Sequence, residues 1–217
     1  MTKESEASKY YDKHAIEFAL QAIDPLKNSF EFDKNMPSIL NMIGKIDGQI
    51  LDFGCGAGNF TSSLVRKDRT VKGCDTSQNL LKFAQQKFPE IVFFNYDGLT
   101  IPNSMNKYDL IVAKLVFHYI EDLESVIIDL SEQLNKYGSI CFSVPHPDKT
   151  KYLINGSNKE SKYTDQVGSF GLTLEMIHRS IDRYKEILDK ASLTIENVIT
   201  ISDNGKPKRL NILATKK

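Results

Sequence analysis

A single ten-residue segment, ILDFGCGAGN at Ile50–Asn59, constrains the fold of this chain more than any other. It starts as a buried strand, continues through glycines at alternate positions and enters a helical pattern at Asn59. Glycine lets the backbone turn sharply and approach a ligand closely, while the start of a helix presents free N–H groups. The segment therefore predicts a loop that binds a nucleotide-like ligand, although a tight strand-to-helix connection without a ligand can have the same composition.

Strand and helix patterns alternate along the chain from this loop onward. Strands are expected at 50–53, 70–74, 91–94, 108–113 and 138–144, and helices at 59–67, 78–88 and 123–134. Strands that alternate with helices form βαβ units. We therefore expect an α/β fold with a mainly parallel sheet that helices cover on both faces.

The chain on either side of this core follows other patterns. A helix is expected at 10–22, ended by Pro25, and a short one after Pro37. The stretch 145–171 has no periodicity and is expected to form a long surface loop, of the kind that often acts as a lid. A short strand at 172–178, a helix capped by Ser180 and two strands at 194–201 and 210–215 around the turn Asp203–Gly205 should follow.

Composition narrows the range of partners. The chain has 28 Lys and Arg against 28 Asp and Glu, and this balance argues against nucleic acid or an anionic membrane as a partner. No stretch has the apolar character of a membrane span or a signal peptide, and the three separated cysteines suit a reducing compartment. We expect a cytoplasmic protein without a metal site; its oligomeric state stays open.

Two acidic residues stand at the ends of the strands that follow the glycine loop. Asp75 comes at the end of the strand at 70–74, where a carboxylate can accept hydrogen bonds from both hydroxyls of a ribose or can cap a helix. Thr76 and Ser77 can cap that helix instead, which would free Asp75. Asp97 follows the strand at 91–94, where it could accept an amino group of a purine or form a simple Asp-Gly turn.

Taken in this order, the segments resemble the class I S-adenosylmethionine-dependent methyltransferases. The run DFGCGAG at Asp52–Gly58 resembles their glycine-rich first motif, Asp75 their ribose acid, and NYDG at Asn95–Gly98 their adenine-contacting motif. The segment Tyr108–Leu123 resembles their fourth strand and the residues after it. The resemblance is closest to the small-molecule enzymes that include those of ubiquinone and menaquinone biosynthesis.

The resemblance implies a Rossmann-like fold with a mostly parallel seven-stranded sheet, helices on both faces and an antiparallel last strand. It also implies a single methyltransferase domain at 1–217. The expected parts are an N-terminal helical cap at 1–47, a cofactor-binding core at 48–145, a substrate lid or insertion at 146–180, and a C-terminal helix with the last two strands at 181–217.

S-adenosylmethionine is the cofactor that the resemblance implies, with S-adenosylhomocysteine as its product. The residues carried over by position as cofactor-binding are Tyr11, Asp52, Gly54, Cys55, Gly56, Gly58, Asp75, Thr76, Asp97, Gly98, Ala113 and Lys114. Lys114 departs from the family, which often has a small or polar residue there, so we expect its stem to pack and its ammonium to reach solvent. Tyr10 and Tyr11 resemble a helix that closes over the cofactor, and can equally be core or surface residues. Cys55 is expected to pack and not to act as a nucleophile.

The need for a catalytic base depends on the methyl acceptor. A hydroxyl or an activated carbon benefits from a general base, whereas a neutral amine attacks unaided. His118, which follows the fourth strand, and His146, at the end of the fifth, are the candidates, although His118 can be a histidine satisfied by packing and His146 a solvated loop residue. Arg179 could clamp a substrate carboxylate or form a surface ion pair. The candidates for substrate contact are Tyr10, Tyr119, Tyr152, His178 and Arg179.

The sequence therefore predicts a cytoplasmic methyltransferase that acts on the oxygen or nitrogen of a small metabolite. A carbon methyltransferase of the quinone-biosynthesis kind and a non-catalytic S-adenosylmethionine-binding protein are the alternatives. A nicotinamide dehydrogenase is less favoured, because Asn59 stands where dinucleotide-binding loops carry their third glycine and because no second nucleotide-binding half is visible.

Overall fold

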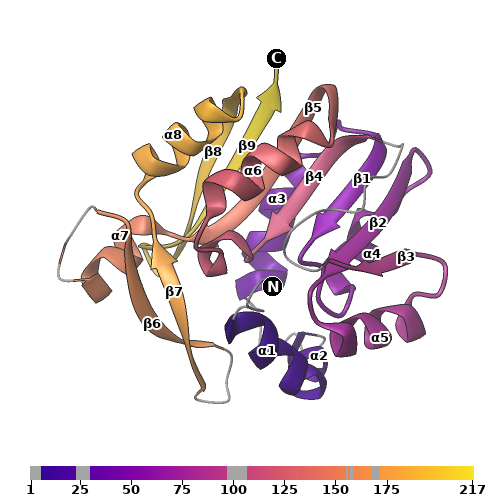
Figure 1. Cartoon of the computed structure of the whole chain (residues 1–217), viewed down its shortest axis with the longest axis horizontal. Helices are drawn as coiled ribbons and strands as arrows, with labels where there is room; N and C mark the ends of the chain where they lie inside the picture. The colour runs from indigo at the N-terminus through magenta and orange to yellow at the C-terminus, as the bar shows by residue number, and fades with distance from the viewer. Residues whose placement is uncertain (1–5, 23–29, 97–106, 155, 157–158, 168–171) are drawn as a thin grey trace.

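Seven strands form one sheet in the order β3-β2-β1-β4-β5-β9-β8 (Figure 1). The computed structural model describes residues 6–22, 30–96, 107–154, 156, 159–167 and 172–217, so Asp97 and Gly98 lie outside the described residues. The strands are β1 (Gly48–Phe53), β2 (Arg69–Asp75), β3 (Val92–Asn95), β4 (Tyr108–Lys114), β5 (Leu134–Pro145), β8 (Leu193–Asp203) and β9 (Lys206–Lys216). The first five are mutually parallel, and β9 runs antiparallel between β5 and β8. This arrangement confirms the Rossmann-like fold with an antiparallel last strand.

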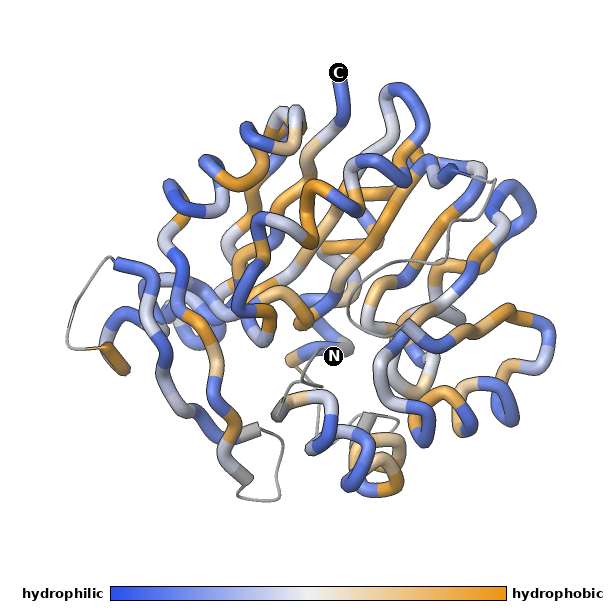
Figure 2. Tube along the Cα trace, in the orientation of Figure 1, coloured by the Kyte–Doolittle hydropathy of each residue, from blue (hydrophilic) through white to orange (hydrophobic). Residues whose placement is uncertain are grey.

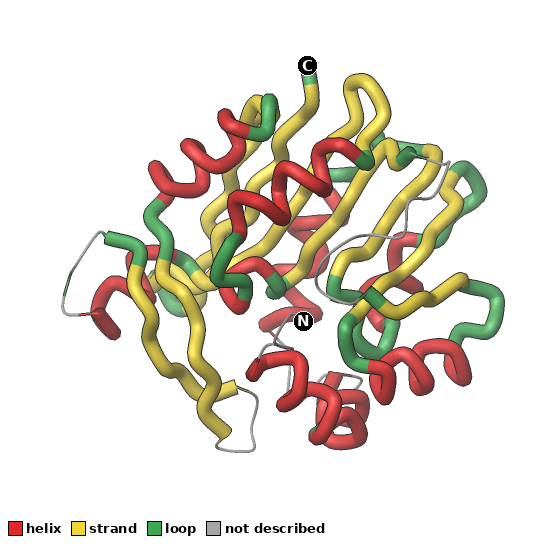
Figure 3. The backbone as a smooth tube through the Cα atoms, viewed as in Figure 1, coloured by secondary structure: helices red, strands yellow, loops and turns green. Residues whose placement is uncertain are grey.

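Helices cover both faces of the sheet (Figure 3). On one face α6 (Leu123–Glu132) and α8 (Ile181–Lys190) pack against strand residues such as Leu51 and Ile111. On the other face α3 (Met36–Met42) and α4 (Asn59–Leu64) pack against their neighbours Ile50 and Leu110. Figure 2 shows hydrophobic residues along the central strands. Because successive strand residues point to opposite faces, these residues supply an apolar cluster on each side of the sheet. The remaining helix of the core, α5 (Gln78–Lys87), follows β2 and packs against β3.

The N-terminal segment forms a cap at the carboxyl ends of the parallel strands. The helix predicted at 10–22 is two helices, α1 (Glu6–Lys13) and α2 (Ala15–Ala22), interrupted at His14. A π-helix, η1 (Glu31–Asn35), leads directly into α3. Figure 1 shows α1 between α5 and β7 (Leu172–His178), and α1 contacts both.

Most of the described residues after β5 belong to helices or a strand, so the prediction of a long surface loop at 145–171 is wrong. This segment contains α7 (Pro147–Lys151), the 3-10 helix η3 (Tyr152–Ile154) and β6 (Ser161–Val167), which pairs antiparallel with β7 in a second, two-stranded sheet. Tyr163, opposite Met176, is buried in an apolar cluster, although its neighbours in the sequence are the polar residues Lys162 and Thr164. One large apolar residue in a run of five polar ones gives too weak an alternation for sequence reasoning to detect a strand.

Other boundaries differ by a few residues. The helix predicted at 59–67 ends at Leu64, and α6 ends at Glu132, so that β5 starts at Leu134 and not at Gly138. The turn between β8 and β9 matches the prediction: Asn204 and Gly205 both have positive φ, as a tight hairpin of type I′ requires. Within the part of the chain that is described, no helix has the length and apolar character needed to cross a bilayer.

Candidate functional site

The glycine loop between β1 and α4 contains one glycine that borders open space. A Cβ at Gly54 would collide with Val116, and one at Gly58 would lie 2.9 Å from Phe93 Cζ. A Cβ at Gly56 would find only Leu80 Cδ1, at 3.9 Å. Packing therefore requires glycine at 54 and 58, whereas Gly56, with φ of +54°, leaves room beside the loop for something outside the protein.

Asp75 ties the end of β2 to this loop. Its Oδ2 accepts a hydrogen bond from the Gly56 backbone N–H at 2.8 Å, and its Oδ1 accepts one from the Ser77 N–H at 2.9 Å. Ser77 caps α5 as predicted, by accepting from the Leu80 N–H at 3.1 Å. Asp75 is therefore not free, but an ionised carboxylate has about four lone-pair sites, so these contacts do not use up its capacity to accept hydrogen bonds. Burial raises the pKa of Asp75.

Other loop residues carried over from the family lie beneath the loop. Asp52 is 1% exposed and accepts a hydrogen bond from Thr61 Oγ1 at 2.6 Å; burial raises its pKa to about 7. Burial also raises the pKa of the Cys55 thiol, which keeps the sulfur uncharged and suits a packing residue. The Thr76 carbonyl accepts from Asn95 Nδ2 at 3.1 Å. These residues shape the loop from below.

The rim is the edge of the sheet at the carboxyl ends of its parallel strands. The cap helix α1 contacts the start of α5 on one side of this rim and Tyr119 on the other. Asp12 Oδ1 accepts hydrogen bonds from Ser77 Oγ and from the Asn79 backbone N–H, each at 2.9 Å, and its Oδ2 accepts from Asn79 Nδ2 at 3.0 Å. On the other side, the Tyr11 hydroxyl lies 2.9 Å from the Tyr119 hydroxyl. Burial raises the pKa of Tyr11 to about 12, so its hydroxyl keeps its proton. Sequence reasoning missed Asp12, although its place directly after Tyr11 marked it.

A buried charged cluster lies at the ends of β4 and β9. Lys114 Nζ is 3.3 Å from Glu31 Oε2, and Arg209 Nε donates to Glu31 Oε1 at 2.9 Å. The expectation that the Lys114 ammonium reaches solvent is wrong, because η1 brings the Glu31 carboxylate to it. Ala113, its neighbour, is fully buried in the core. Arg209 was not among the predicted site residues. An antiparallel last strand begins at this rim, so a cation near its start was a signal for it.

The two histidine candidates have different surroundings. His146 uses both ring nitrogens: Nε2 lies 3.1 Å from Thr200 Oγ1, and Nδ1 accepts from the Asp148 N–H at 3.2 Å at the start of α7. This arrangement is structural and leaves no nitrogen for a substrate. His118, in the 3-10 helix η2 (Phe117–Tyr119), is buried, and its Nδ1 has no hydrogen-bond partner among the described residues. Burial, with the nearby cations, lowers the pKa of His118 to about 3.

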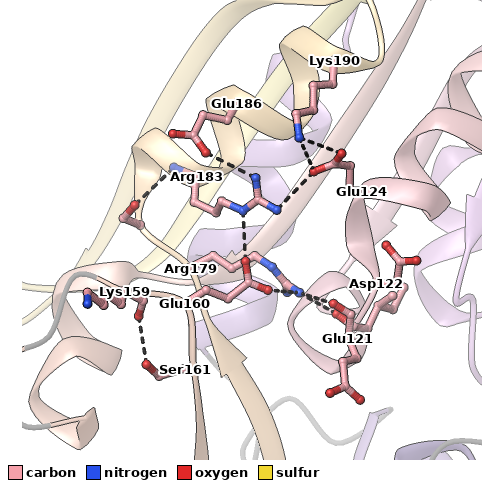
Figure 4. A network of polar contacts seen from close by, with 12 residues as sticks. Glu121, Asp122, Glu124, Lys159, Glu160, Ser161, Arg179, Arg183, Glu186 and Lys190 are labelled. Atoms are coloured by element: carbon pink, nitrogen blue, oxygen red, sulfur yellow. Dashed lines mark hydrogen bonds and ion pairs between the residues drawn. The ribbon is translucent and has the colours of Figure 1, made fainter.

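Arg179 is a structural residue in this arrangement, not the substrate clamp or surface ion pair that were considered for it. Its guanidinium donates to the carbonyls of Phe117, Ile120 and Glu121 at 3.2, 2.8 and 3.0 Å. It also pairs with Glu160 at 2.9 Å, in the network of Figure 4. Its side chain is 0% exposed, so no surface remains for a ligand.

The other residues predicted to contact the substrate include Tyr10, His178 and Tyr152, and they differ in burial. Tyr10, on α1, is partly buried, and its hydroxyl has no partner among the residues described. His178 is buried, with Nδ1 2.6 Å from Thr150 Oγ1. Tyr152 is 85% exposed and therefore lies at the surface. The structure therefore brings Tyr10, Tyr11, Tyr119 and His118 together and leaves Tyr152 at the surface. In the described ranges, no three His, Cys, Asp or Glu side chains gather as metal ligands would.

The strand order, the glycine loop and the acidic residue at the end of β2 define the class I methyltransferase fold. In agreement, residues 50–138 match the model of a family described as "Methyltransferase domain". The matched segment runs from the start of the glycine loop strand into β5.

Particular relatives carry the same description. An uncharacterized methyltransferase of Bacillus thuringiensis (strain Al Hakam) is 34% identical over 108 residues, which cover 48% of this chain and 50% of that protein. The chain thus spans about half the length of the curated relatives it matches.

Solved structures are similar in fold over most of the chain. A putative S-adenosylmethionine-dependent methyltransferase from Listeria monocytogenes has a TM-score of 0.65 and 24% identity, covering 83% of this chain and 99% of that one. Magnesium protoporphyrin IX methyltransferase from Synechocystis PCC 6803, solved with bound SAH, has a TM-score of 0.63 and 18% identity, covering 84% and 82%. At these identities the similarity establishes the fold.

Proposed function

We propose that this protein is an S-adenosylmethionine-dependent methyltransferase that acts on the oxygen or nitrogen of a small molecule in the cytoplasm. The observation that carries the proposal is the arrangement around Gly56. Its N–H is fixed by Asp75, no side chain of the described residues fills the space beside it, and α1 covers the rim through Tyr11 and Asp12. The match of residues 50–138 to the methyltransferase domain supports the same reading.

The described residues fit this cofactor. The carboxylate of Asp75 keeps accepting capacity for a ribose hydroxyl beyond its bonds to Gly56 and Ser77, and the space beside Gly56 suits the amino-acid part of the cofactor. Tyr11 lies close enough to Asp75 for the carboxylate charge to contribute to its raised pKa, so its ring would cover the sugar. Bound S-adenosylmethionine supplies a methyl group on a sulfonium.

The protein's part in the reaction is to align the methyl donor with the acceptor and to exclude water from them. Orientation of two reactants can supply about 7 to 11 kcal/mol of a barrier. The cap helix α1 closes the rim through Tyr11 and Asp12, which would keep the acceptor beside the donor. His118 is neutral at physiological pH, and its Nδ1 is available to take the proton that the acceptor loses.

The low basicity of His118 also bears on the acceptor. A pKa of about 3 makes its imidazole a weak base, and catalytic bases work best near the operating pH. Such a base suits an amine, or a hydroxyl that is already acidic, better than a carbon acid. We therefore favour transfer to nitrogen or oxygen over the carbon methylation of the quinone-biosynthesis kind.

The test is transfer of a labelled methyl group from S-adenosylmethionine to an extract of cellular small molecules. We expect labelled product together with calorimetric binding of S-adenosylhomocysteine. Binding without any labelled acceptor would instead support a non-catalytic cofactor-binding protein. Absence of binding would contradict the proposal altogether. Retention of the protein on RNA at moderate salt would contradict a small-molecule acceptor.

A further inference from the structure

Arg209 stands at the rim on the side away from the proposed donor site. In the register of the sheet it pairs with Pro145, where β5 ends. Because β5 is parallel to β4 and β1, its carboxyl end lies at the same rim as the glycine loop. The donor-site residues come from β1 and β2, and β4 and β5 separate β9 from them. Arg209 is therefore placed to meet the acceptor and not the cofactor.

The cluster around Arg209 has more positive than negative charge. Glu31 is shared between Arg209 Nε at 2.9 Å and Lys114 Nζ at 3.3 Å, and it also accepts from Asn35 Nδ2 at 2.7 Å. Both cations lower the pKa of Glu31, which keeps it ionised. Two cations thus share one carboxylate, and one positive charge is left over. In contrast, the nearby Lys149 has its own partner in Asp165, at 3.0 Å.

The guanidinium of Arg209 has an open edge. Nε donates to Glu31, and Nη1 donates to the Lys208 carbonyl at 3.1 Å. Nη2 has no partner among the residues that the structure describes, and the side chain is 16% exposed. A guanidinium with Nη1 and Nη2 on one side can hold a carboxylate by two parallel hydrogen bonds. Nη1 has given one of its two hydrogens to the Lys208 carbonyl and Nη2 has given none, so each nitrogen of this edge keeps a hydrogen that a carboxylate could accept.

Other unpaired polar groups lie on the same side of the rim. Tyr163, on β6, is 6% exposed, and His118, on η2, is 4% exposed. The Tyr163 hydroxyl and His118 Nδ1 have no hydrogen-bond partner within the described part of the chain. Burial raises the pKa of Tyr163 and the charge of Arg209 opposes this rise, whereas burial and then Arg209 lower the pKa of His118, so the guanidinium lies within electrostatic reach of η2 and of β6. A buried polar atom without a partner is destabilising, and a polar ligand that supplied a hydrogen bond would remove this penalty.

We propose that the methyl acceptor is a small carboxylic acid, whose carboxylate is bound by the Nη1–Nη2 edge of Arg209 while its polar groups meet Tyr163 and His118. This inference rests on the proposed methyl transfer. A single carboxylate would cancel the excess charge of the cluster formed by Glu31, Lys114 and Arg209. The carboxylate is held at β9, so the methylated atom is another atom of the acceptor.

The experiment separates a cell extract into anionic, neutral and cationic fractions by ion exchange and offers each to the enzyme with labelled S-adenosylmethionine. We expect the label to enter the anionic fraction at least tenfold more than the other two. Arg209→Gln should lower kcat/KM for that fraction at least tenfold, with S-adenosylhomocysteine affinity unchanged. Lys208→Gln is the matched control, because this neighbouring cation pairs with the surface residue Asp203 at 3.2 Å; it should keep wild-type transfer.

Further variants guard against a folding defect. Arg209→Lys keeps the charge beside Glu31 but loses the two-pronged edge, so it should fold and still raise KM for the anionic fraction. Glu31→Gln leaves the guanidinium without its internal counter-ion and should not weaken use of that fraction. This inference would be overturned by label that enters mainly the neutral or cationic fraction. It would also be overturned if a folded Arg209→Gln variant methylated the anionic fraction as well as the wild type does. Neither result would contradict the proposed function. No label in any fraction would contradict the proposed function itself and this inference with it.

Discussion

Asp12 Oδ1 accepts a hydrogen bond from the backbone N–H of Asn79 at 2.9 Å, so a residue of α1 satisfies a free donor at the start of α5. Helix starts have four unpaired N–H groups, and a side-chain oxygen that binds one contributes about 0.5 to 2 kcal/mol. This contact fastens the cap over the rim where we place the cofactor. Its strength should therefore set how readily the cap opens.

Asp12→Ala should loosen the cap while the core stays folded. The loss of 0.5 to 2 kcal/mol corresponds to roughly two- to thirtyfold faster release of S-adenosylhomocysteine, measured by stopped flow. Hydrogen exchange in residues 6–13 should rise in parallel. Asp12→Asn keeps an oxygen for the Asn79 N–H but loses the one that accepts from Asn79 Nδ2, so its release rate should lie between those of the wild type and the Ala variant. Equal release rates for the Ala variant would show that α1 does not retain the ligand.

Gly56→Ala should abolish or strongly weaken cofactor binding, measured by calorimetry, because the added methyl group would enter the space beside the loop. The backbone strain of a positive φ, about 1 to 2 kcal/mol, has to be separated from this effect. Gly205→Ala is the matched control: Gly205 has φ of +73° and open space around it, but lies in the β8–β9 turn. Normal binding by the Gly56 variant would contradict the assignment of the loop.

Asp75→Ala should weaken cofactor binding by roughly 1.5 to 3 kcal/mol, as the loss of a charged hydrogen-bond acceptor does. The variant also frees the Gly56 N–H, so its unfolding should be measured without ligand to separate stability from binding. Unchanged affinity for S-adenosylhomocysteine would remove Asp75 from the site.

Asp52 should make the stability of the protein depend on pH. Burial raises its pKa to about 7, from 3.8, so between these values the folded state keeps a proton that the unfolded chain has lost. Its contribution to the free energy of unfolding therefore decreases as pH rises from about 4 to 7, by up to ~4 kcal/mol. Asp52→Asn cannot lose this proton, so its stability relative to the wild type should increase from pH 4.5 to pH 8 in urea titrations. A pH-independent difference would contradict the buried carboxyl.

His118 should stay neutral throughout the range in which the enzyme works. Because burial and nearby cations hold its pKa at about 3, turnover should show no acid limb near pH 6.5. Steady-state rates between pH 5 and 8 test this expectation. A limb near pH 6.5 that disappears in His118→Gln would show that the imidazole titrates normally.

Sequence reasoning predicted the parts of the molecule where local pattern and tertiary role coincide. The central strand β4 and the second half of β5 are mainly apolar because both faces of the sheet are buried there, and glycine at 54 and 58 is required by packing. The fold could therefore be predicted from the alternation of strand and helix patterns and from the glycine loop at 54–58. Asp75 could be placed at a strand end, but its two backbone contacts could not be foreseen.

The features that escaped prediction depend on contacts between distant segments. Glu31 and Arg209 are 178 residues apart, and each alone reads as a surface charge. Arg179 looked like a ligand-binding residue because a lone arginine carries no sign of the carbonyls it will bind. Tyr163 lies in a polar run, and its burial depends on pairing with β7. Such residues become recognisable only when the topology brings their partners together.

The contacts of Arg179 have a practical consequence for protein engineering. One guanidinium, at the end of β7, holds the backbone of Phe117 and Ile120, next to His118 and Tyr119. An exchange of the 146–180 segment between relatives would replace this anchor together with the insertion. A chimera without an arginine at position 179 would lose the hydrogen bonds that hold the backbone of Phe117 and Ile120. The insertion and the 3-10 helix η2 therefore have to be transplanted as one unit.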